Sequence, residues 1–121
     1  MSSDTAALVT RAVERFQVEV PALAELKLVF ALELKGRGDL QVFRVEVPGP
    51  KVSKEQPDDA RVSVTVGRAE FNDLAEKGTV ESYRTAWETG EIKASGDPNI
   101  QKLIGQIVAR QIERSRLKKS H

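Results

Sequence analysis

Cysteine is absent from the 121-residue sequence, and histidine occurs once, at the last position. Without cysteine there can be no disulfide, no thiolate zinc ligand and no cysteine nucleophile, and nothing points to an oxidising compartment. His121 is a poor general base, because a side chain at a chain end rarely holds the fixed geometry that proton transfer requires. These two shortages exclude a Ser-His-acid triad, and we expect the protein not to be an enzyme.

An excess of charge of either sign is also missing. The chain has 19 Lys and Arg against 18 Asp and Glu, which gives a formal net charge of +1. A protein so nearly neutral has no overall field to hold a polyanion, so we expect no nucleic-acid partner. The run Gly36-Arg37-Gly38 predicts a turn and not a dinucleotide site, and the acidic pair Asp58-Asp59 lacks further ligands at useful spacing. We therefore expect no cofactor and no metal.

Long hydrophobic runs are missing as well. No apolar stretch approaches the roughly 20 residues that cross a bilayer, and the start, Met1-Ser2-Ser3-Asp4, lacks the basic-then-apolar order of a secretion signal. These observations favour a cytoplasmic protein. With 40% hydrophobic and 31% charged residues the composition is that of an ordinary globular protein, and 121 residues suit a single domain, which we place at residues 1–121.

The first half of the chain changes from helical to strand periodicity. Apolar residues at helical spacing predict an amphipathic helix over about residues 4–17, and Pro21 interrupts the segment that follows it. Residues 27–35 and 40–47 alternate with a period of two and predict an antiparallel hairpin around a Gly-rich turn. Residues 51–55, between two Pro-containing loops, are either a short edge strand or an irregular connection.

The second half returns to helices after one strand. Residues 61–66 alternate, and a short helix then ends at Gly78, after which Thr79 can cap another. A short strand over residues 91–95 precedes a long last helix with a wide apolar stripe from Ile100 to Ile112. This order predicts an α+β fold with a largely antiparallel sheet and helices packed on one face.

One block of the second half resembles a known family. Its marks are Val62-Ser63-Val64-Thr65-Val66, then Phe71, Leu74, Gly78, Ala86-Trp87, Gly90, Ile92-Lys93 and Gly96-Asp97. In order and spacing these residues are similar to the characteristic block of the sterol carrier protein lipid-binding domain. The hairpin and the first helix fit that family by arrangement more than by motif.

The resemblance implies an about five-stranded sheet covered by helices that enclose an apolar tunnel for fatty acids, acyl-CoA, sterols or phospholipids. Two features depart from the family's pattern. Ala86-Trp87 is followed by Glu88-Thr89, where the family usually has a small or apolar residue, and Pro48-Gly49-Pro50 interrupts the region of a regular third strand. Both departures predict a tunnel that is narrowed or reshaped.

Apolar side chains are the candidate ligand contacts, because pockets for hydrophobic ligands are mostly lined by such groups. The candidates are Phe30, Leu32, Phe71, Leu74, Tyr83, Trp87, Leu103, Ile104 and Ile107. Core packing is the competing interpretation for Tyr83 and Trp87. For the C-terminal stripe, core packing and contact with a second subunit both stay open.

Positive charge gathers at the end of the last helix, where Glu113 alone opposes it. The basic residues are Arg110, Arg114, Arg116, Lys118 and Lys119. They predict contact with an anionic membrane surface or with the phosphates of an acyl-CoA. The alternative is a solvated helix end whose cations favour the negative end of the helix dipole.

The function predicted from sequence is therefore the non-catalytic binding or transfer of a lipid or fatty acyl ligand. The alternative is an accessory module that assists another enzyme by binding a protein partner, or a second copy of itself, with no lipid bound. A stable oligomer that the substitution Ile104→Asp disrupts would favour this alternative.

Overall fold

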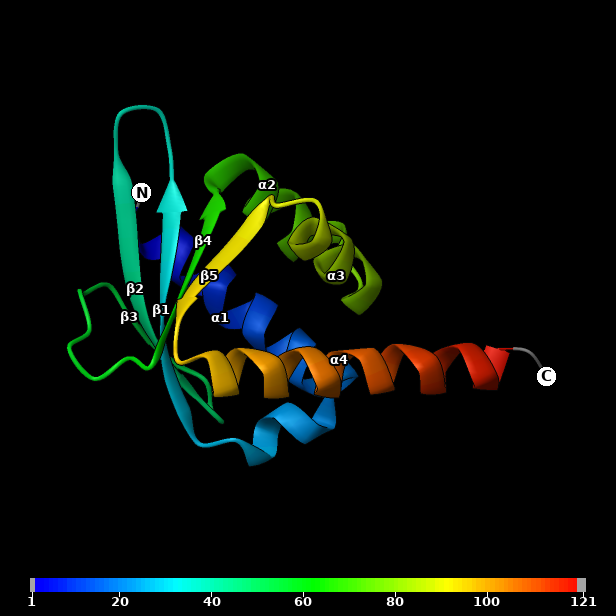
Figure 1. Ribbon diagram of the computed structural model, residues 1–121. Helices are drawn as coiled ribbons and strands as arrows, with labels where there is room; N and C mark the ends of the chain where they lie inside the picture. The colour runs from blue at the N-terminus through cyan, green and yellow to red at the C-terminus, as the bar shows by residue number, and fades with distance from the viewer. Residues whose placement is uncertain (1, 120–121) are drawn as a thin grey trace.

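The computed structural model describes residues 2–119 (Figure 1). The elements, in chain order, are α1 (Ser2–Glu19), the 3-10 helix η1 (Pro21–Glu25), β1 (Leu28–Lys35), β2 (Leu40–Val47), β3 (Lys51–Ser53), β4 (Val62–Gly67), α2 (Arg68–Lys77), α3 (Val80–Glu88), β5 (Ile92–Gly96) and α4 (Pro98–Lys119). The α+β class predicted from sequence is confirmed. Ser3 and Asp4, which the sequence offers as a cap for the first helix, have side chains outside those described.

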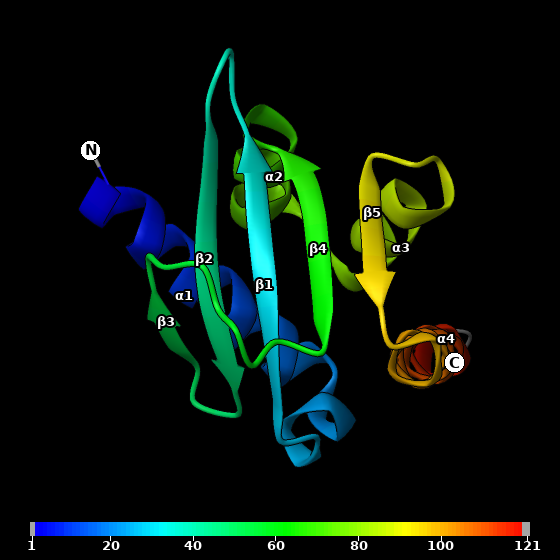
Figure 2. The ribbon, with the colours of Figure 1, turned by 60° about the vertical axis from the view of Figure 1, so that its left-hand side comes forward.

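The five strands form one sheet in the order β3-β2-β1-β4-β5 (Figure 2). Three of its pairings are antiparallel, whereas β1 and β4 run parallel, with Phe30 opposite Val62. The parallel pair arises because the chain leaves β3 at one edge, crosses the face opposite the helices, and enters β4 beside β1 (Figure 2). The sheet is thus mixed but mostly antiparallel, and residues 51–53 form the edge strand.

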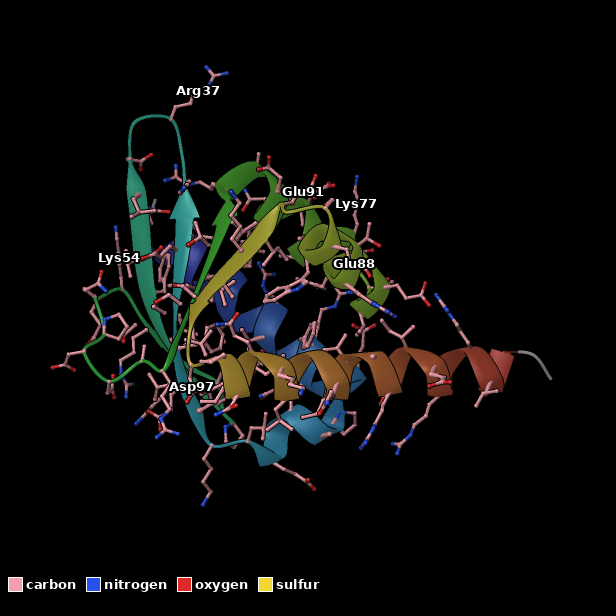
Figure 3. All side chains as sticks on the ribbon, in the orientation of Figure 1. Arg37, Lys54, Lys77, Glu88, Glu91 and Asp97 are labelled. Atoms are coloured by element: carbon pink, nitrogen blue, oxygen red, sulfur yellow. The ribbon has the colours of Figure 1, made fainter. Side chains whose placement is uncertain are left out.

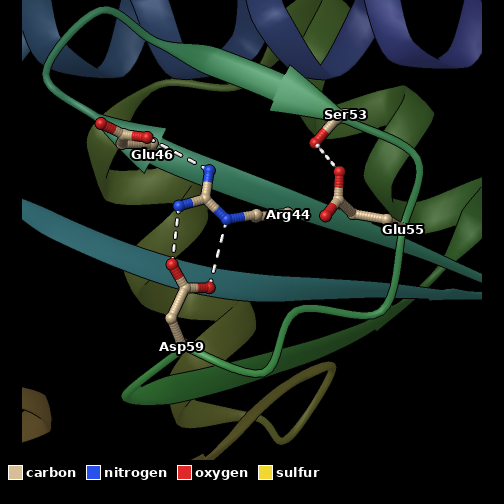
Figure 4. Close-up of polar contacts among 5 residues, drawn as sticks. All are labelled: Arg44, Glu46, Ser53, Glu55 and Asp59. Atoms are coloured by element: carbon tan, nitrogen blue, oxygen red, sulfur yellow. Dashed lines mark hydrogen bonds and ion pairs between the residues drawn. The ribbon is translucent and has the colours of Figure 1, made fainter.

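Arg44 binds the crossing segment, residues 54–61, to the sheet (Figure 4). Its guanidinium donates two hydrogen bonds to Asp59, at 2.7 and 3.1 Å, and a third at 3.1 Å to Glu46 on the same strand. A planar fork of this kind fixes both the position and the orientation of a carboxylate. Pro57, in the same segment, is buried.

Helices α1 and α2 cover the other face of the sheet, and the main core lies between them and the strands (Figure 2). The alternation predicted for β2 and β4 holds, since Phe43, Val45 and Val66 are buried there. Arg15 of α1 donates to the carbonyl oxygens of Ala75 and Glu76 at 3.0 and 3.4 Å, and so binds the end of α2. The buried residues of the core are Val9, Ala12, Leu32, Leu34, Phe43, Val45, Val66, Phe71 and Ala75.

The boundaries of the later helices follow the sequence signals. The amide of Gly78 bonds the carbonyl of Leu74 at 2.8 Å and ends α2, and Thr79 accepts from the amide of Ser82 at 3.3 Å to begin α3. Asp97 accepts from the amide of Asn99 at 2.9 Å ahead of α4, whose first residue is proline. Thr79 and Asp97 are the side-chain caps expected at helix starts, whereas Gly78 ends α2 in extended backbone with φ of −72°.

A second apolar cluster, smaller than the core, holds α4 in place. It joins Val20 before η1, Val80 of α3 and Ile112 of α4, all buried. Beyond Ile112 the last turns of α4 project past the rest of the molecule (Figure 1). Helix α4 is therefore held by Ile112, about two thirds of the way along it, and by its contacts with β5 and η1.

Candidate functional site: an apolar cavity between the sheet and the helices

A cavity of about 530 Å³ lies between the inner face of the sheet and helices α1, α2, α3 and α4. Its volume falls within the range of about 300–1,000 Å³ that is typical of small-molecule sites. The lining comprises Ala12, Val13, Phe16, Gln17, Leu23, Leu26, Leu28, Phe30, Leu32, Val47, Val62, Val64, Val66, Phe71, Leu74, Tyr83, Arg84, Trp87, Glu88, Ile92, Ala94, Gln101, Ile104, Gly105, Val108 and Ala109. Most of these residues are aliphatic or aromatic, so the cavity suits a hydrophobic ligand.

Strand alternation makes the floor of the cavity apolar. Because side chains on a strand point to opposite faces in turn, Phe30 and Leu32 of β1 lie on the same face as Val64 of β4. The intervening polar residues face outward, where Thr65 donates a 2.8 Å hydrogen bond to Glu33. The sheet therefore keeps its polar groups on the side away from the cavity.

Helices α3 and α4 supply the opposite wall. Tyr83 and Trp87, one turn apart on α3, both line the cavity, as do Ile104 and Val108 of α4. Gly105 occupies the same face of α4, where a β-carbon would meet no atom within 4 Å. The missing side chain at Gly105 leaves space that a ligand can enter.

The mouth of the cavity lies where lining residues reach solvent, between α3 and α4. Trp87 is 46% exposed although it lines the cavity. Arg84 and Glu88, on the same helix, form an ion pair at 3.7 Å and also belong to the lining. Figure 3 labels Glu88 near the end of α3 and Asp97 at the start of α4, the two helices that border this opening.

An aromatic pair packs at the α1 side of the cavity. The rings of Phe16 and Tyr83 meet edge to face with centroids 5.2 Å apart. Burial raises the pKa of the Tyr83 phenol above its ordinary value, while Arg15 acts to lower it and Glu19 to raise it. The phenol is therefore neutral at physiological pH and offers a hydrogen bond but no charge.

Seven of the nine candidate contacts named from sequence line the cavity, and Leu103 and Ile107 do not. Leu103 is 41% exposed, whereas Ile107 packs against the Val20–Val80–Ile112 cluster. The reason is angular: Leu103 and Ile107 are four residues apart and share one margin of the apolar stripe of α4, which is wider than the face that lines the cavity. Reasoning from sequence missed the contributions of α1 and of residues 23–28, although the apolar stripe of α1 carried that signal.

The basic residues of α4 do not join this lining. Arg110 and Arg114 are exposed, and Arg116 forms a 3.6 Å ion pair with Glu81 of α3. The side chains of Lys118 and Lys119 lie outside those described. Across residues 2–119 we find no cluster of three potential metal-ligating side chains, nor a helix both long and apolar enough to traverse a bilayer.

Solved structures of sterol carrier protein 2 (SCP2) and SCP2-like domains share this fold. Palmitated sterol carrier protein 2-like 2 of Aedes aegypti superposes with a TM-score of 0.59 at 23% identity, covering 83% of this chain and 93% of that one. A crystal structure of the same mosquito protein gives 0.56 at 25% identity over 83% and 95%. Sterol carrier protein 2 of Yarrowia lipolytica, in its apo form, gives 0.53 at 19% identity over 74% and 81%. No protein-family model and no curated protein matches the chain.

Proposed function

We propose that this chain, which has the SCP2-like fold, binds a single long hydrophobic ligand in the cavity and carries or presents it without covalent chemistry. The observation that supports this most directly is the cavity of about 530 Å³, whose floor and walls are apolar and whose mouth opens between α3 and α4. The likeness to a palmitated protein supports an acyl chain as one ligand of this class.

The free energy of binding follows from the lining. Each methylene removed from water contributes about 0.8 kcal/mol, so ten of them give roughly 8 kcal/mol before the costs of ordering the ligand. Because this term is non-directional, the chain length of the ligand matters more to affinity than the identity of its head group. Release into a membrane or to another protein then requires only that the mouth be accessible.

Our first test fills the cavity from α4. The substitution Gly105→Leu places a side chain in the space that the glycine leaves open, and we expect at least a tenfold loss of affinity for a fluorescent fatty acid. The matched control is Gln106→Leu, at the exposed neighbouring position outside the lining, which should bind like the wild type. Both proteins should unfold at or above the wild-type temperature, because leucine is a better helix former than glycine and about as good as glutamine.

Native mass spectrometry of the purified wild type, followed by solvent extraction, completes this test. A lipid or fatty acid bound at near-unit stoichiometry, and lost in Gly105→Leu, would support the proposal. A wild-type protein that is empty and also binds no fluorescent fatty acid would contradict it.

A further inference from the structure

One amide in the cavity wall has no hydrogen-bond partner. The Nε2 atom of Gln17, on α1, is buried and unbonded among the described residues. Gln17 lies one turn beyond Val13 and next to Phe16, and all three line the cavity. A buried amide without a partner costs about 1–3 kcal/mol, so its position in a binding cavity calls for an explanation.

Three of the other polar side chains of the lining have partners, and the neutral phenol of Tyr83 lies on α3 against Phe16. Arg84 pairs with Glu88 at 3.7 Å, and the amide of Gln101 donates to the carbonyl of Gly96 at 3.2 Å. These three residues belong to α3 and α4, on either side of the mouth. Gln17 is set apart from them on α1, and its neighbours in the lining from that helix are apolar.

We propose that Gln17 binds an uncharged acceptor oxygen of the ligand, so that the cavity selects hydrophobic molecules carrying a neutral ketone, ester or similar carbonyl over pure hydrocarbon. This rests on the proposed function and names its ligand class. The last torsion of a glutamine side chain is soft, so the amide can turn its N–H toward the cavity when an acceptor arrives.

The charge of the acceptor follows from its surroundings. A carboxylate placed against a neutral amide in an apolar wall would lose its hydration without gaining a counter-charge, and the cost of that exceeds the gain from one hydrogen bond. A neutral carbonyl loses much less on burial, and the amide restores the hydrogen bond that it gave up in water. An acidic head group belongs instead at the mouth, near Arg84.

The test compares two ligands with the same number of carbons, 2-tridecanone and tridecane, in displacing the apolar fluorophore diphenylhexatriene. In the wild type we expect the ketone to bind about three- to tenfold more tightly, relative to its partitioning into hydrocarbon, than the alkane. In Gln17→Leu this preference should disappear while the alkane binds as well as before. The ligand-free Gln17→Leu protein should also melt at a higher temperature, because an unpartnered buried amide has been removed.

The matched control is Gln41→Leu on β2. Gln41 also has a buried unbonded amide atom, but it lies outside the cavity lining. We expect Gln41→Leu to keep the full preference for the ketone. If wild type and Gln17→Leu show the same preference for the ketone over the alkane, the role of Gln17 is overturned and the cavity's function stays intact. If the wild type binds neither ligand, the proposed function itself is overturned. A larger loss in Gln17→Leu for dodecanoate than for the ketone would overturn the choice of a neutral acceptor.

Discussion

Asp59 is the residue through which the crossing segment holds to the outer face of the sheet. Hydrogen bonds from Arg44 hold the pKa of this carboxyl below its ordinary value of 3.8, and the same bonds raise the pKa of the guanidinium. Both groups reach solvent, so water and salt weaken the pair. The Arg44–Asp59 pair matters because it fixes the position of the crossing segment, which contains little regular structure.

A pH dependence follows from the lowered pKa of Asp59. Because the folded pKa lies below the unfolded one, the stabilisation is complete above pH 3.8 and is lost as the pH falls through the folded value. The stability difference between wild type and Asp59→Asn should therefore be constant from neutral pH to about pH 5 and shrink toward zero in stronger acid. Urea unfolding at a series of pH values measures it.

The control for that series is Asp58→Asn. Asp58 is the adjacent exposed carboxylate, and the described contacts of Arg44 do not include it. The substitution makes the same charge change with no loss of the fork. A pH-independent difference for Asp59→Asn, or an equal effect of Asp58→Asn, would contradict the assigned role of the Arg44 fork.

At the scale of elements, α4 depends on few contacts for its position. It touches α3, β5 and η1, and its one buried side chain among those described is Ile112. A helix that is anchored at so few points can open locally at a lower free energy than the core. This is the property expected of the wall through which a ligand enters.

We predict that Ile112→Ala destabilises the docking of α4 by about 2–4 kcal/mol, since it leaves a cavity between Val20 and Val80. Hydrogen exchange should rise in α4 and η1 well before it rises in β1 and β2. Leu103→Ala, on an exposed part of the same helix, should cost less than about 1 kcal/mol. If exchange instead rose uniformly through the sheet, α4 would be part of one cooperative unit with the core.

At the scale of the whole molecule, α4 borders the mouth of the cavity and carries the basic residues, and it lies beside β5, remote from β3 at the other edge of the sheet (Figure 2). Arg110 and Arg114 are exposed and one turn apart. An anionic membrane would attract this end of the molecule first, at about 1 kcal/mol for each basic residue near the surface. We therefore propose that the basic residues of α4 bring the mouth to the membrane.

The measurement is sedimentation with liposomes. Binding should increase with the fraction of anionic lipid and decrease with salt, and Arg110→Gln with Arg114→Gln should reduce it about tenfold or more. Lys51→Gln with Lys54→Gln removes the same charge at the opposite edge and should leave binding nearly unchanged. Binding that is insensitive to salt, or equally weakened by both pairs, would contradict this orientation.

Local signals in the sequence determined which elements form and where they end. Strand alternation, the helical stripe of α4, Gly78 as a helix end and Thr79 as a cap depend on neighbouring residues only, and each is present as expected. The residues marking the resemblance, from Val62 to Asp97, likewise indicated the SCP2-like fold that the comparisons show. The helix ends, caps and strand alternation could be read from sequence because each is set within a few residues along the chain, whereas the fold was indicated by the resemblance.

Tertiary structure alone decided which apolar residues face the cavity. Ile104 and Ile107 are equally apolar and belong to the same stripe, yet one lines the cavity and the other packs with Val20 and Val80. The parallel pairing of β1 with β4, and the unbonded amide of Gln17 at the wall, were decided there too. The physical reason is that hydrophobicity marks a side chain for burial but does not specify the partner against which it is buried, and the partner depends on how segments distant in sequence pack together.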